Sequence, residues 1–381
     1  MKDLAMLLKV DNLTPMQLIL GFLTPVIAYA GITLLHIIIP VKKTIGYVKN
    51  EKTGELLNYR INGIFVLAAS VIIWFLLGFY KIVPYNWLYL VRWPSLISAV
   101  VIGLIFSFIL VLKAPSTGKP FLADFWFGRL INPQVGNGFI DAKMWLYLIG
   151  AVMLQLHVLS FGAHHWQTHE VVNPGFILGA AMSTWFCWEY LFFERVHLYT
   201  YDIFAERVGF KLGWGCLTFY PYFYAITLWI TVDAGNPGLP FWLLIAFALL
   251  FYVGWIFTRG ANLQKYYFKI APEKKFICIK PEVITDGKRT LLVSGYWGMS
   301  RHINYLGEIV QAVAIALVAF VYGAGSIGYP LILFVWLYPV YYFGLLLTRA
   351  VDDGVICKAK YGDLWDVYKK RVKWFVIPGI F

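Results

Sequence analysis

The stretch LLVSGYWGMSRHINYLGE, residues 291–308, is the part of the chain around which the rest is arranged. It is too polar to cross a bilayer, yet apolar stretches long enough to do so lie on both sides of it. It concentrates side chains suited to a polar ligand: Trp297, Arg301, His302, Asn304 and Tyr305. An arginine fork suits phosphate because it donates two parallel hydrogen bonds. The stretch is therefore either a ligand-binding segment or an interfacial loop whose aromatic side chains anchor at the lipid headgroups.

The composition predicts an integral membrane protein. Of the 381 residues, 60% are hydrophobic and 14% are charged, whereas a soluble domain is nearer half apolar and a quarter charged. The net charge of +12 does not indicate a nucleic-acid partner, because the basic residues lie in short loops between apolar segments. The four cysteines form no CxxC pair, so we expect no metal site and no disulfide framework.

Nine apolar segments have about the ~20 residues that cross a bilayer. The predicted fold is therefore all-α and polytopic, with about nine to ten transmembrane helices. The predicted spans are residues 16–41, 61–80, 93–112, 144–163, 174–194, 212–232, 239–258, 306–324 and 326–348. We expect a single integral membrane domain over residues 1–381, with N-terminal spans in 16–194 and a catalytic and cofactor-binding region in 195–381.

The positions of the basic residues predict the orientation. If the C-terminus lies in the cytoplasm, the cytoplasmic segments contain every Lys and Arg except Lys2, Lys9, Lys81 and Arg92. This distribution follows the positive-inside rule. The largest cytoplasmic segments fall in the last third of the chain, so a cytoplasmic ligand is expected to bind loops of that third.

Carboxylates gather at and after the end of the fifth predicted span. They are Glu189, Glu194, Asp202 and Glu206. Carboxylates at membrane depth are costly and usually face a cavity or a partner, where one of them could act as a general acid. The alternative is a set of interfacial charges paired with Arg195 and Arg207.

Two other motifs are interpreted as structural. His164, His165 and His169 have a spacing that can ligate a metal, but we predict a polar loop on the non-cytoplasmic side. The sequence GAGSIG, residues 323–328, matches the dinucleotide-binding pattern G-x-G-x-x-G. The pattern needs a βαβ unit, whereas here it joins two apolar spans, so we predict a tight turn between two helices.

Two stretches of the last third resemble parts of a cofactor site. Lys265 and Lys269 are four residues apart, so on a helix they share a face that could receive phosphates or anionic lipid. Tyr361, Trp365 and Tyr368 recur at helical spacing and predict one aromatic helix face. That face is either an interfacial helix or a wall for an adenine or nicotinamide ring, with Asp353 binding ribose hydroxyls or an amide.

In these stretches the sequence resembles the sterol reductase family. That family includes delta-14 sterol reductase, 7-dehydrocholesterol reductase, delta-24(28) sterol reductase and the membrane domain of the lamin B receptor. Its blocks LLxSGWWGxxRHxNYxGD, FRGANxQK and HRxxRDxxxCxxKYGxxWxxY are here LLVSGYWGMSRHINYLGE, FTRGANLQK and TRAVDDGVICKAKYGDLWDVY. The likeness runs from about residue 45 to the C-terminus. Cys216 stands where the family has Asp, and Asp352 stands where it often has Arg.

The resemblance implies an NADPH-dependent oxidoreductase of sterol biosynthesis. It would reduce a carbon–carbon double bond of a sterol by protonation and then hydride transfer, with delta-14 favoured and delta-24(28) or delta-7 as alternatives. The sterol would come from the bilayer and NADPH from the cytosol. The membrane would be the endoplasmic reticulum in a eukaryote or the inner membrane in a bacterium, with the cofactor site facing the cytoplasm.

The resemblance also implies site residues. The cofactor-binding residues are Lys265, Lys269, Leu292, Trp297, Arg301, His302, Asn304, Tyr305, Arg349, Asp353, Tyr361 and Tyr368. Of these, Lys265, Lys269 and Arg301 are expected to contact phosphate. The catalytic candidates on the proton path are Glu189, Tyr190, Glu194 and Asp202.

Two other functions fit parts of the sequence. An isoprenylcysteine carboxyl methyltransferase, which uses S-adenosylmethionine, also has an RHPxYxG-type motif and a paired acidic site near its C-terminus, but here Asp352 and Asp353 replace its two glutamates. A non-catalytic sterol-binding membrane protein is the second alternative, because Cys216 and Asp352 depart from the reductase pattern.

Overall fold

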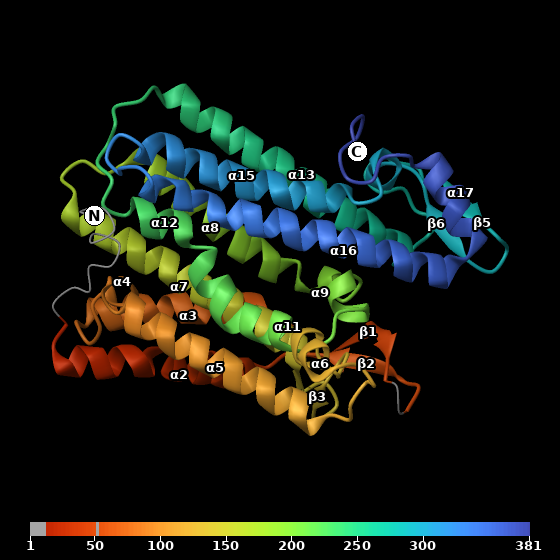
Figure 1. Ribbon diagram of the computed structural model, residues 1–381, viewed down its shortest axis with the longest axis horizontal. Coiled ribbons are helices and arrows are strands. Elements are labelled where there is room, and N and C mark those ends of the chain that lie inside the picture. Colours follow the sequence, from red (N-terminus) through yellow and green to blue (C-terminus); the bar gives the residue numbers. More distant parts are fainter. Residues whose placement is uncertain (1–12, 51–52) are drawn as a thin grey trace. The chain divides into compact units, whose positions relative to one another are not determined.

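The computed structural model describes residues 13–50 and 53–381, which are mostly helical (Figure 1). The chain divides into two compact units. The first unit is Met1–Leu239 with Ala319–Val335, and the second is Pro240–Val318 with Trp336–Phe381. The predicted division of one membrane domain after residue 194 stays a prediction.

Helix α7 (Ala142–Thr168) is the central helix of the first unit. Its side chains are buried on nearly every face, because other helices of the unit pack around it. Those helices are α2 (Pro15–Ile38), α3 (Gly63–Phe79), α4 (Trp87–Leu90), α8 (Pro174–Phe192) and the π-helix η1 (Gly215–Phe223). Helix α5 (Arg92–Lys113) packs against α2 and η1. A helix that is apolar all round belongs in the interior, which explains the position of α7.

The predicted span 212–232 is broken into three helical pieces. They are α11 (Phe210–Trp214), the π-helix η1 and α12 (Ile226–Thr231). Pro221 lies inside η1 and cannot donate a backbone hydrogen bond, and a π-helical turn is one way to accommodate such a break. The prediction of one regular helix over this segment is therefore wrong.

Short elements connect the long helices. Three antiparallel hairpins pair β1 (Thr44–Lys49) with β2 (Leu56–Tyr59), β3 (Gln134–Val135) with β4 (Ile140–Asp141), and β5 (Val283–Thr285) with β6 (Thr290–Leu292). Short helices α6 (Phe121–Phe127), α9 (Glu194–His197) and α10 (Tyr201–Phe204) also belong to the first unit.

The second unit is built on α13 (Phe241–Ile270), the first part of α15 (Ile303–Gly323) and α16 (Leu337–Tyr361). Helices α13 and α15 touch at Gly254 and Gly307, where a Cβ on Gly254 would lie 2.7 Å from the carbonyl oxygen of Gly307. Only glycine allows so close an approach of two backbones. Thr258 fixes the same contact by donating a 3.0 Å hydrogen bond to the carbonyl oxygen of Asn304.

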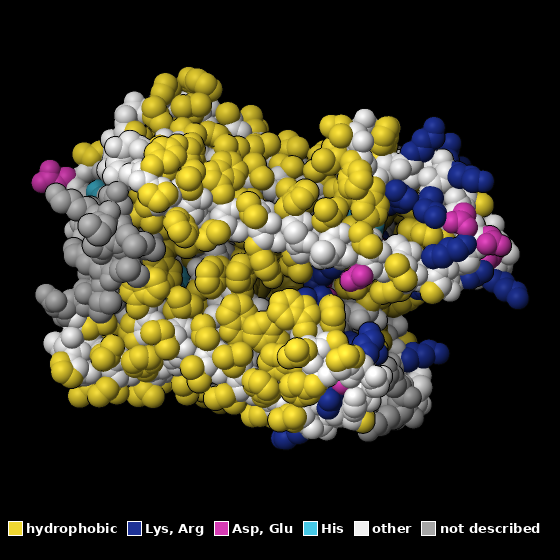
Figure 2. Space-filling model, viewed as in Figure 1, with side chains coloured by type: hydrophobic (Ala, Val, Ile, Leu, Met, Phe, Trp, Pro, Cys, Tyr) yellow, Lys and Arg dark blue, Asp and Glu magenta, His cyan; other side chains and the backbone are white. Residues whose placement is uncertain are grey.

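Six helical stretches are long and apolar enough to cross a membrane. They are Pro15–Ile38, Arg92–Lys113, Ala142–Thr168, Phe241–Ile270, Ile303–Gly323 and Leu331–Tyr361, the last beginning with the 3-10 helix η2 (Leu331–Trp336). Helix α3 is apolar but shorter. These helices make the chain an integral membrane protein, and the larger number of nine to ten spans stays a prediction. Figure 2 shows hydrophobic side chains covering the long helices on one face.

The structure differs from two local predictions and confirms a third. The helices α13 and α16 run well past the predicted ends at 258 and 348, to Ile270 and Tyr361. His164 and His165 lie within α7, so the predicted polar loop is wrong there. The turn predicted at 323–328 is confirmed by hydrogen bonds from the amides of Ser326 and Ile327 to the carbonyl oxygen of Gly323.

Candidate functional site

In the second unit, hydrogen bonds attach the segment 291–308 to helix α13. The carboxamide of Gln264 donates to the carbonyl oxygen of Ser294 at 3.1 Å and accepts from the amide of Tyr296 at 3.0 Å. One turn earlier on α13, the carbonyl oxygen of Ala261 accepts a 2.9 Å hydrogen bond from the indole of Trp297. These contacts place the short helix α14 (Tyr296–Met299) against α13.

Trp297 is the point where three helices of the unit meet. The Lys265 ammonium, on α13, lies 5.3 Å from the centre of the Trp297 ring, within the range of a cation–π interaction. The Tyr368 hydroxyl, on α17 (Asp363–Arg371), donates to the carbonyl oxygen of Trp297 at 3.2 Å. Tyr368 is buried, and burial raises the pKa of its hydroxyl, so this phenol stays protonated.

Asp353 adds a carboxylate to this group from α16. It interacts electrostatically with Lys265 and accepts a hydrogen bond from the Cys357 thiol, one helical turn further on. Arg349 precedes Asp353 by four residues on the same helix and therefore shares its face. The structure thus brings together cationic, acidic and aromatic side chains from α13, α14, α16 and α17.

Arg301 and His302 lie beside Phe375 near the C-terminus. The guanidinium of Arg301 is 5.2 Å from the centre of the Phe375 ring. The His302 ring stacks on Tyr305 at a centroid distance of 5.2 Å. Burial, followed by the charges of Arg301 and Lys265, lowers the pKa of His302 to about 3, so its imidazole is neutral. Within the described part of the chain, neither Nε of Arg301 nor Nε2 of His302 has a hydrogen-bond partner.

The predicted single aromatic helix over 361–368 is wrong, because the chain turns at Gly362. Its φ of 58° lies in the left-handed region that favours glycine. Tyr361 therefore ends α16, whereas Trp365 and Tyr368 lie on α17. The aromatic group still forms, since Trp365 stacks on Tyr368 at 4.9 Å and Tyr361 packs against the hydrophobic cluster that contains both.

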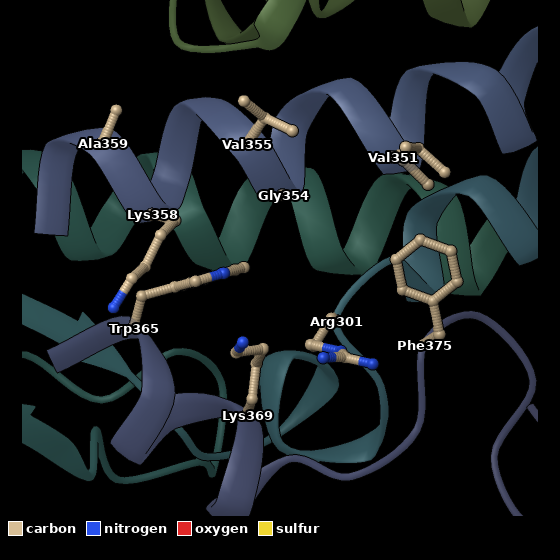
Figure 3. A pocket seen from close by; sticks show the side chains of 10 residues that line it. Arg301, Val351, Gly354, Val355, Lys358, Ala359, Trp365, Lys369 and Phe375 are labelled. Carbon is tan, nitrogen blue, oxygen red and sulfur yellow. The ribbon is translucent and has the colours of Figure 1, made fainter. Parts of the chain in front are cut away.

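A pocket of about 590 Å³ lies between α16 and α17 (Figure 3). Arg301, Lys358 and Lys369 supply its cations, while Trp365 and Phe375 supply its aromatic walls. The rest of the lining is the small and apolar face of α16: Ala350, Val351, Gly354, Val355 and Ala359. Figure 3 shows Arg301, Lys358, Trp365 and Lys369 in the space between the two helices.

Of the predicted cofactor residues, only Arg301 lines this pocket. Lys265, Trp297, Asp353 and Tyr368 form the neighbouring group, and Trp365 joins the two because it lines the pocket and stacks on Tyr368.

Three of the predicted residues outside both groups have other surroundings. Lys269 is exposed at the end of α13, Leu292 is buried in the β5–β6 hairpin, and the Asn304 side chain donates to Asn262 at 3.4 Å. No sequence pattern distinguishes Lys358 or Lys369, since each is an ordinary lysine of a basic tail.

The catalytic candidates lie in the first unit. Asp202 accepts a 2.8 Å hydrogen bond at Oδ1 from the hydroxyl of Tyr147, and the rings of Tyr147 and Tyr190 are 6.0 Å apart. Tyr190 stacks on His197 at 4.0 Å. The buried ammonium of Lys143 donates to the carbonyl oxygens of Asp202 at 2.7 Å and Ile203 at 2.9 Å.

The other two carboxylates have different surroundings. Glu194 is buried and accepts a 2.8 Å hydrogen bond at Oε2 from the amide of Gly63, at the start of α3. This bond satisfies one of the backbone amides left free at the helix N-terminus, which gives Glu194 a structural reason to be buried. Glu189 is half-buried near the end of α8. Tyr147 and Lys143 were not predicted as site residues, although they share a face of α7 at a spacing of four residues.

No group of three or more His, Cys, Asp or Glu side chains that could hold a metal ion is found among residues 13–50 and 53–381. In the three-histidine motif, the His165 and His169 rings stack at 4.2 Å, and the other contacts are with different groups. His165 bonds the carbonyl oxygen of Val232 at 2.6 Å, and the His164 ring stacks on Tyr89 at 3.6 Å.

Comparison with known proteins decides the family. Residues 22–381 match the Ergosterol biosynthesis ERG4/ERG24 family. The chain belongs to the ERG4/ERG24 family of sterol reductases. The resemblance predicted from the sequence blocks is confirmed, and ERG4/ERG24 membership makes the protein an oxidoreductase of sterol and lipid metabolism.

Several ERG4/ERG24 relatives share one name. The delta(14)-sterol reductase of Methylotuvimicrobium alcaliphilum is 31% identical over 344 residues, covering 86% of this chain and 76% of the relative. The delta(14)-sterol reductase of Arabidopsis thaliana is 34% identical over 267 residues, covering 70% of this chain and 68% of the relative. The delta(14)-sterol reductase TM7SF2 of Mus musculus is 29% identical over 383 residues, covering 97% of this chain and 86% of the relative.

Proposed function

We propose that the protein reduces the delta-14 carbon–carbon double bond of a sterol with NADPH as hydride donor. The observation that carries the proposal is the group of Lys265, Trp297, Asp353 and Tyr368. Its members come from the three sequence blocks that resemble the sterol reductases. Relatives named delta(14)-sterol reductases support the choice of double bond.

The residues of the second unit fit a nicotinamide cofactor. Bound NADPH would supply a hydride, which is the part of the chemistry that a protein side chain cannot provide. Arg301 and Lys265 would neutralise its phosphates, and the unpartnered Nε of Arg301 leaves a buried donor for that purpose. Asp353 would accept hydrogen bonds from ribose hydroxyls or from an amide. The rings of Trp297 and Tyr368 would restrict the position of a planar ring.

A side chain of the protein has to supply the proton. An isolated alkene is a poor hydride acceptor, so one carbon must first accept a proton and leave a cation on the other carbon. That cation then accepts the hydride, and the product gains one proton and one hydride overall. We assign the proton path to Tyr190, Asp202 and Tyr147, because Asp202 holds the Tyr147 hydroxyl at 2.8 Å and the two tyrosine rings are 6.0 Å apart.

The substrate and the cofactor would reach the enzyme from different phases. A sterol is dissolved in the bilayer, whereas a dinucleotide is confined to water. We propose that the cofactor region of residues 259–305 and 349–381 faces the cytoplasm, in agreement with its many basic residues and the positive-inside rule. The membrane would be the endoplasmic reticulum in a eukaryote or the inner membrane in a bacterium.

The decisive experiment measures the thermal midpoint of the detergent-purified protein with NADPH, NADH or S-adenosylmethionine. A ligand that binds only the folded state raises the midpoint by mass action. We expect NADPH to raise it and S-adenosylmethionine to leave it unchanged, and a delta-14 unsaturated sterol to be reduced when NADPH is present. A shift with S-adenosylmethionine alone would replace the proposal by methyl transfer. Sterol binding with no dinucleotide effect would replace it by a non-catalytic sterol-binding protein.

A further inference from the structure

We propose that a cavity between α2 and α3 of the first unit binds a second sterol, which is not the one that is reduced. The cavity has a volume of about 480 Å³, within the roughly 300–1,000 Å³ of small-molecule sites. Its walls come from α2, α3, α4, the loop between α3 and α4, and one residue of α7. The described residues that line it include none of the catalytic or cofactor candidates. A molecule bound there therefore contacts no group assigned to the reaction.

The cavity extends from the lipid-facing surface to the central helix. Ile27 and Leu34 of α2 and Ile73 of α3 line it, and they are 61%, 57% and 43% exposed. Leu156 of α7 also lines it and is only half-buried, although most of the helix around it is fully buried. The exposed apolar side of a membrane helix meets lipid tails. A molecule dissolved in the bilayer can therefore enter the cavity from the side.

The lining favours an uncharged lipid with a hydroxyl group. Its described members include no Lys, Arg, His, Asp or Glu, so none of them would pair with the phosphate of a phospholipid. The Thr24 hydroxyl donates to the carbonyl oxygen of Leu20 at 2.8 Å and accepts from the indole of Trp87 at 3.1 Å. The Ser70 hydroxyl donates to the carbonyl oxygen of Val66 at 2.8 Å. A hydroxyl oxygen has two lone pairs, so both side chains can still accept a hydrogen bond from an alcohol.

The walls fit a flat ring system. Trp74 and Trp87 line the cavity, and a 3.2 Å hydrogen bond to the carbonyl oxygen of Tyr85 fixes the Trp74 indole. On α2 the lining includes Ala28 and Gly31, and a Cβ added at Gly31 would meet nothing within 4 Å. A rigid fused-ring lipid loses less conformational entropy in such a space than a flexible acyl chain does. A sterol combines a flat apolar body with a single hydroxyl, which is the combination that this cavity matches.

The test is photolabelling of the full-length protein in phosphatidylcholine nanodiscs with a cholesterol analogue that has a diazirine on its rings. Mass spectrometry should find the label on residues 20–35 and 70–77, and excess cholesterol should displace it. Gly31→Phe and Ala28→Leu fill the cavity, so each should raise the probe concentration for half-maximal labelling by roughly tenfold or more. Gly162→Phe is the matched control, because Gly162 of α7 also has open space around its Cβ position and does not line the cavity. An unchanged thermal midpoint without added sterol shows that each variant is folded.

The outcomes separate this inference from the proposed function. Label outside α2 and α3, or unchanged labelling in both Gly31→Phe and Ala28→Leu, would refute the site. Equal labelling by a phosphatidylcholine with a diazirine in its acyl chain, not displaced by cholesterol, would assign the cavity to phospholipid and overturn the inference. Turnover with NADPH should be unchanged in folded Gly31→Phe, and its loss would make the cavity the substrate site instead. Photolabelling needs neither dinucleotide nor turnover, so its failure leaves the reductase proposal intact.

Discussion

The hydroxyl of Tyr147 donates a 2.8 Å hydrogen bond to Oδ1 of Asp202 across 55 positions of sequence. One turn before Tyr147 on α7, Lys143 holds the backbone carbonyl oxygens of Asp202 and Ile203. Two side chains of one helix therefore fix both the backbone and the carboxylate of the Asp202 segment. This arrangement orients Asp202 toward α7.

If the Tyr147–Asp202 pair delivers the proton, Tyr147→Phe should lower kcat at least tenfold, because general acid–base groups contribute about 10²–10⁴-fold to rates. The ring and its packing remain, so KM for the sterol should change little. Tyr80→Phe is the control, since Tyr80 is 67% exposed. Steady-state kinetics over a range of pH measures both parameters. An unchanged kcat and pH profile in Tyr147→Phe would remove this pair from the proton path.

Asp353 is predicted to be essential for the cofactor. Asp353→Ala or Arg349→Ala should abolish NADPH-dependent turnover, because each removes a charge from the α16 face that interacts with Lys265. Both variants should remain monodisperse in detergent, since these side chains are only half-buried. Asp352→Ala is the neighbouring control, because Asp352 is exposed. Full activity in both Asp353→Ala and Arg349→Ala would refute the proposed cofactor site.

Gly362 should be intolerant of a side chain. Its φ of 58° and ψ of −130° are accessible to glycine and strained for other residues, so Gly362→Ala should cost about 1–3 kcal/mol of stability. Gly344→Ala is the opposite control, since Gly344 lies inside α16 with open space around it. Alanine within a helix is favoured over glycine by about 0.5–1 kcal/mol. Thermal unfolding of the two variants should therefore shift in opposite directions.

His302 should make the second unit sensitive to acid. Its pKa is about 3 in the folded protein, against an ordinary value of 6.5, so below pH 6.5 the unfolded chain binds a proton that the folded chain does not. The free energy of unfolding is therefore highest above pH 6.5, and it decreases as the pH falls toward 3. Between pH 6.5 and 5 the loss is about 2 kcal/mol. His302→Gln should show a correspondingly weaker decline of the thermal midpoint over this range, and an identical decline would contradict the assignment.

The positions of the membrane helices could be predicted from hydropathy, but not all of their shapes. Each predicted span contains helix, since apolar segments of this length have few alternatives in a bilayer. The π-helical break around Pro221 and the extension of α13 to Ile270 could not be predicted. Hydropathy does not report backbone geometry, and it ends a helix where polar residues begin even when the helix continues. The same reason explains the histidines that were assigned to a loop.

The grouping of the candidate site residues could be predicted where those residues are close in sequence. The segment 291–308 and the Lys265 and Asp353 blocks were recognised from local patterns, and the structure brings their residues together. Lys358 and Lys369 were missed because the turn at Gly362, between them, is what places both beside Asp366. Tyr147 was missed because its partner Asp202 lies far along the chain.

The glycine contact between α13 and α15 has a consequence for ligand binding. These helices flank residues 271–302, and the approach of Gly254 to Gly307 holds the two helices in contact. The Gln264 carboxamide and the Ala261 carbonyl then hold its middle part. A loop with fixed ends and fixed middle has little conformational entropy left to lose. Binding to Trp297 and its neighbours would therefore be pre-organised, with the ordering of this loop completed when the chain folds.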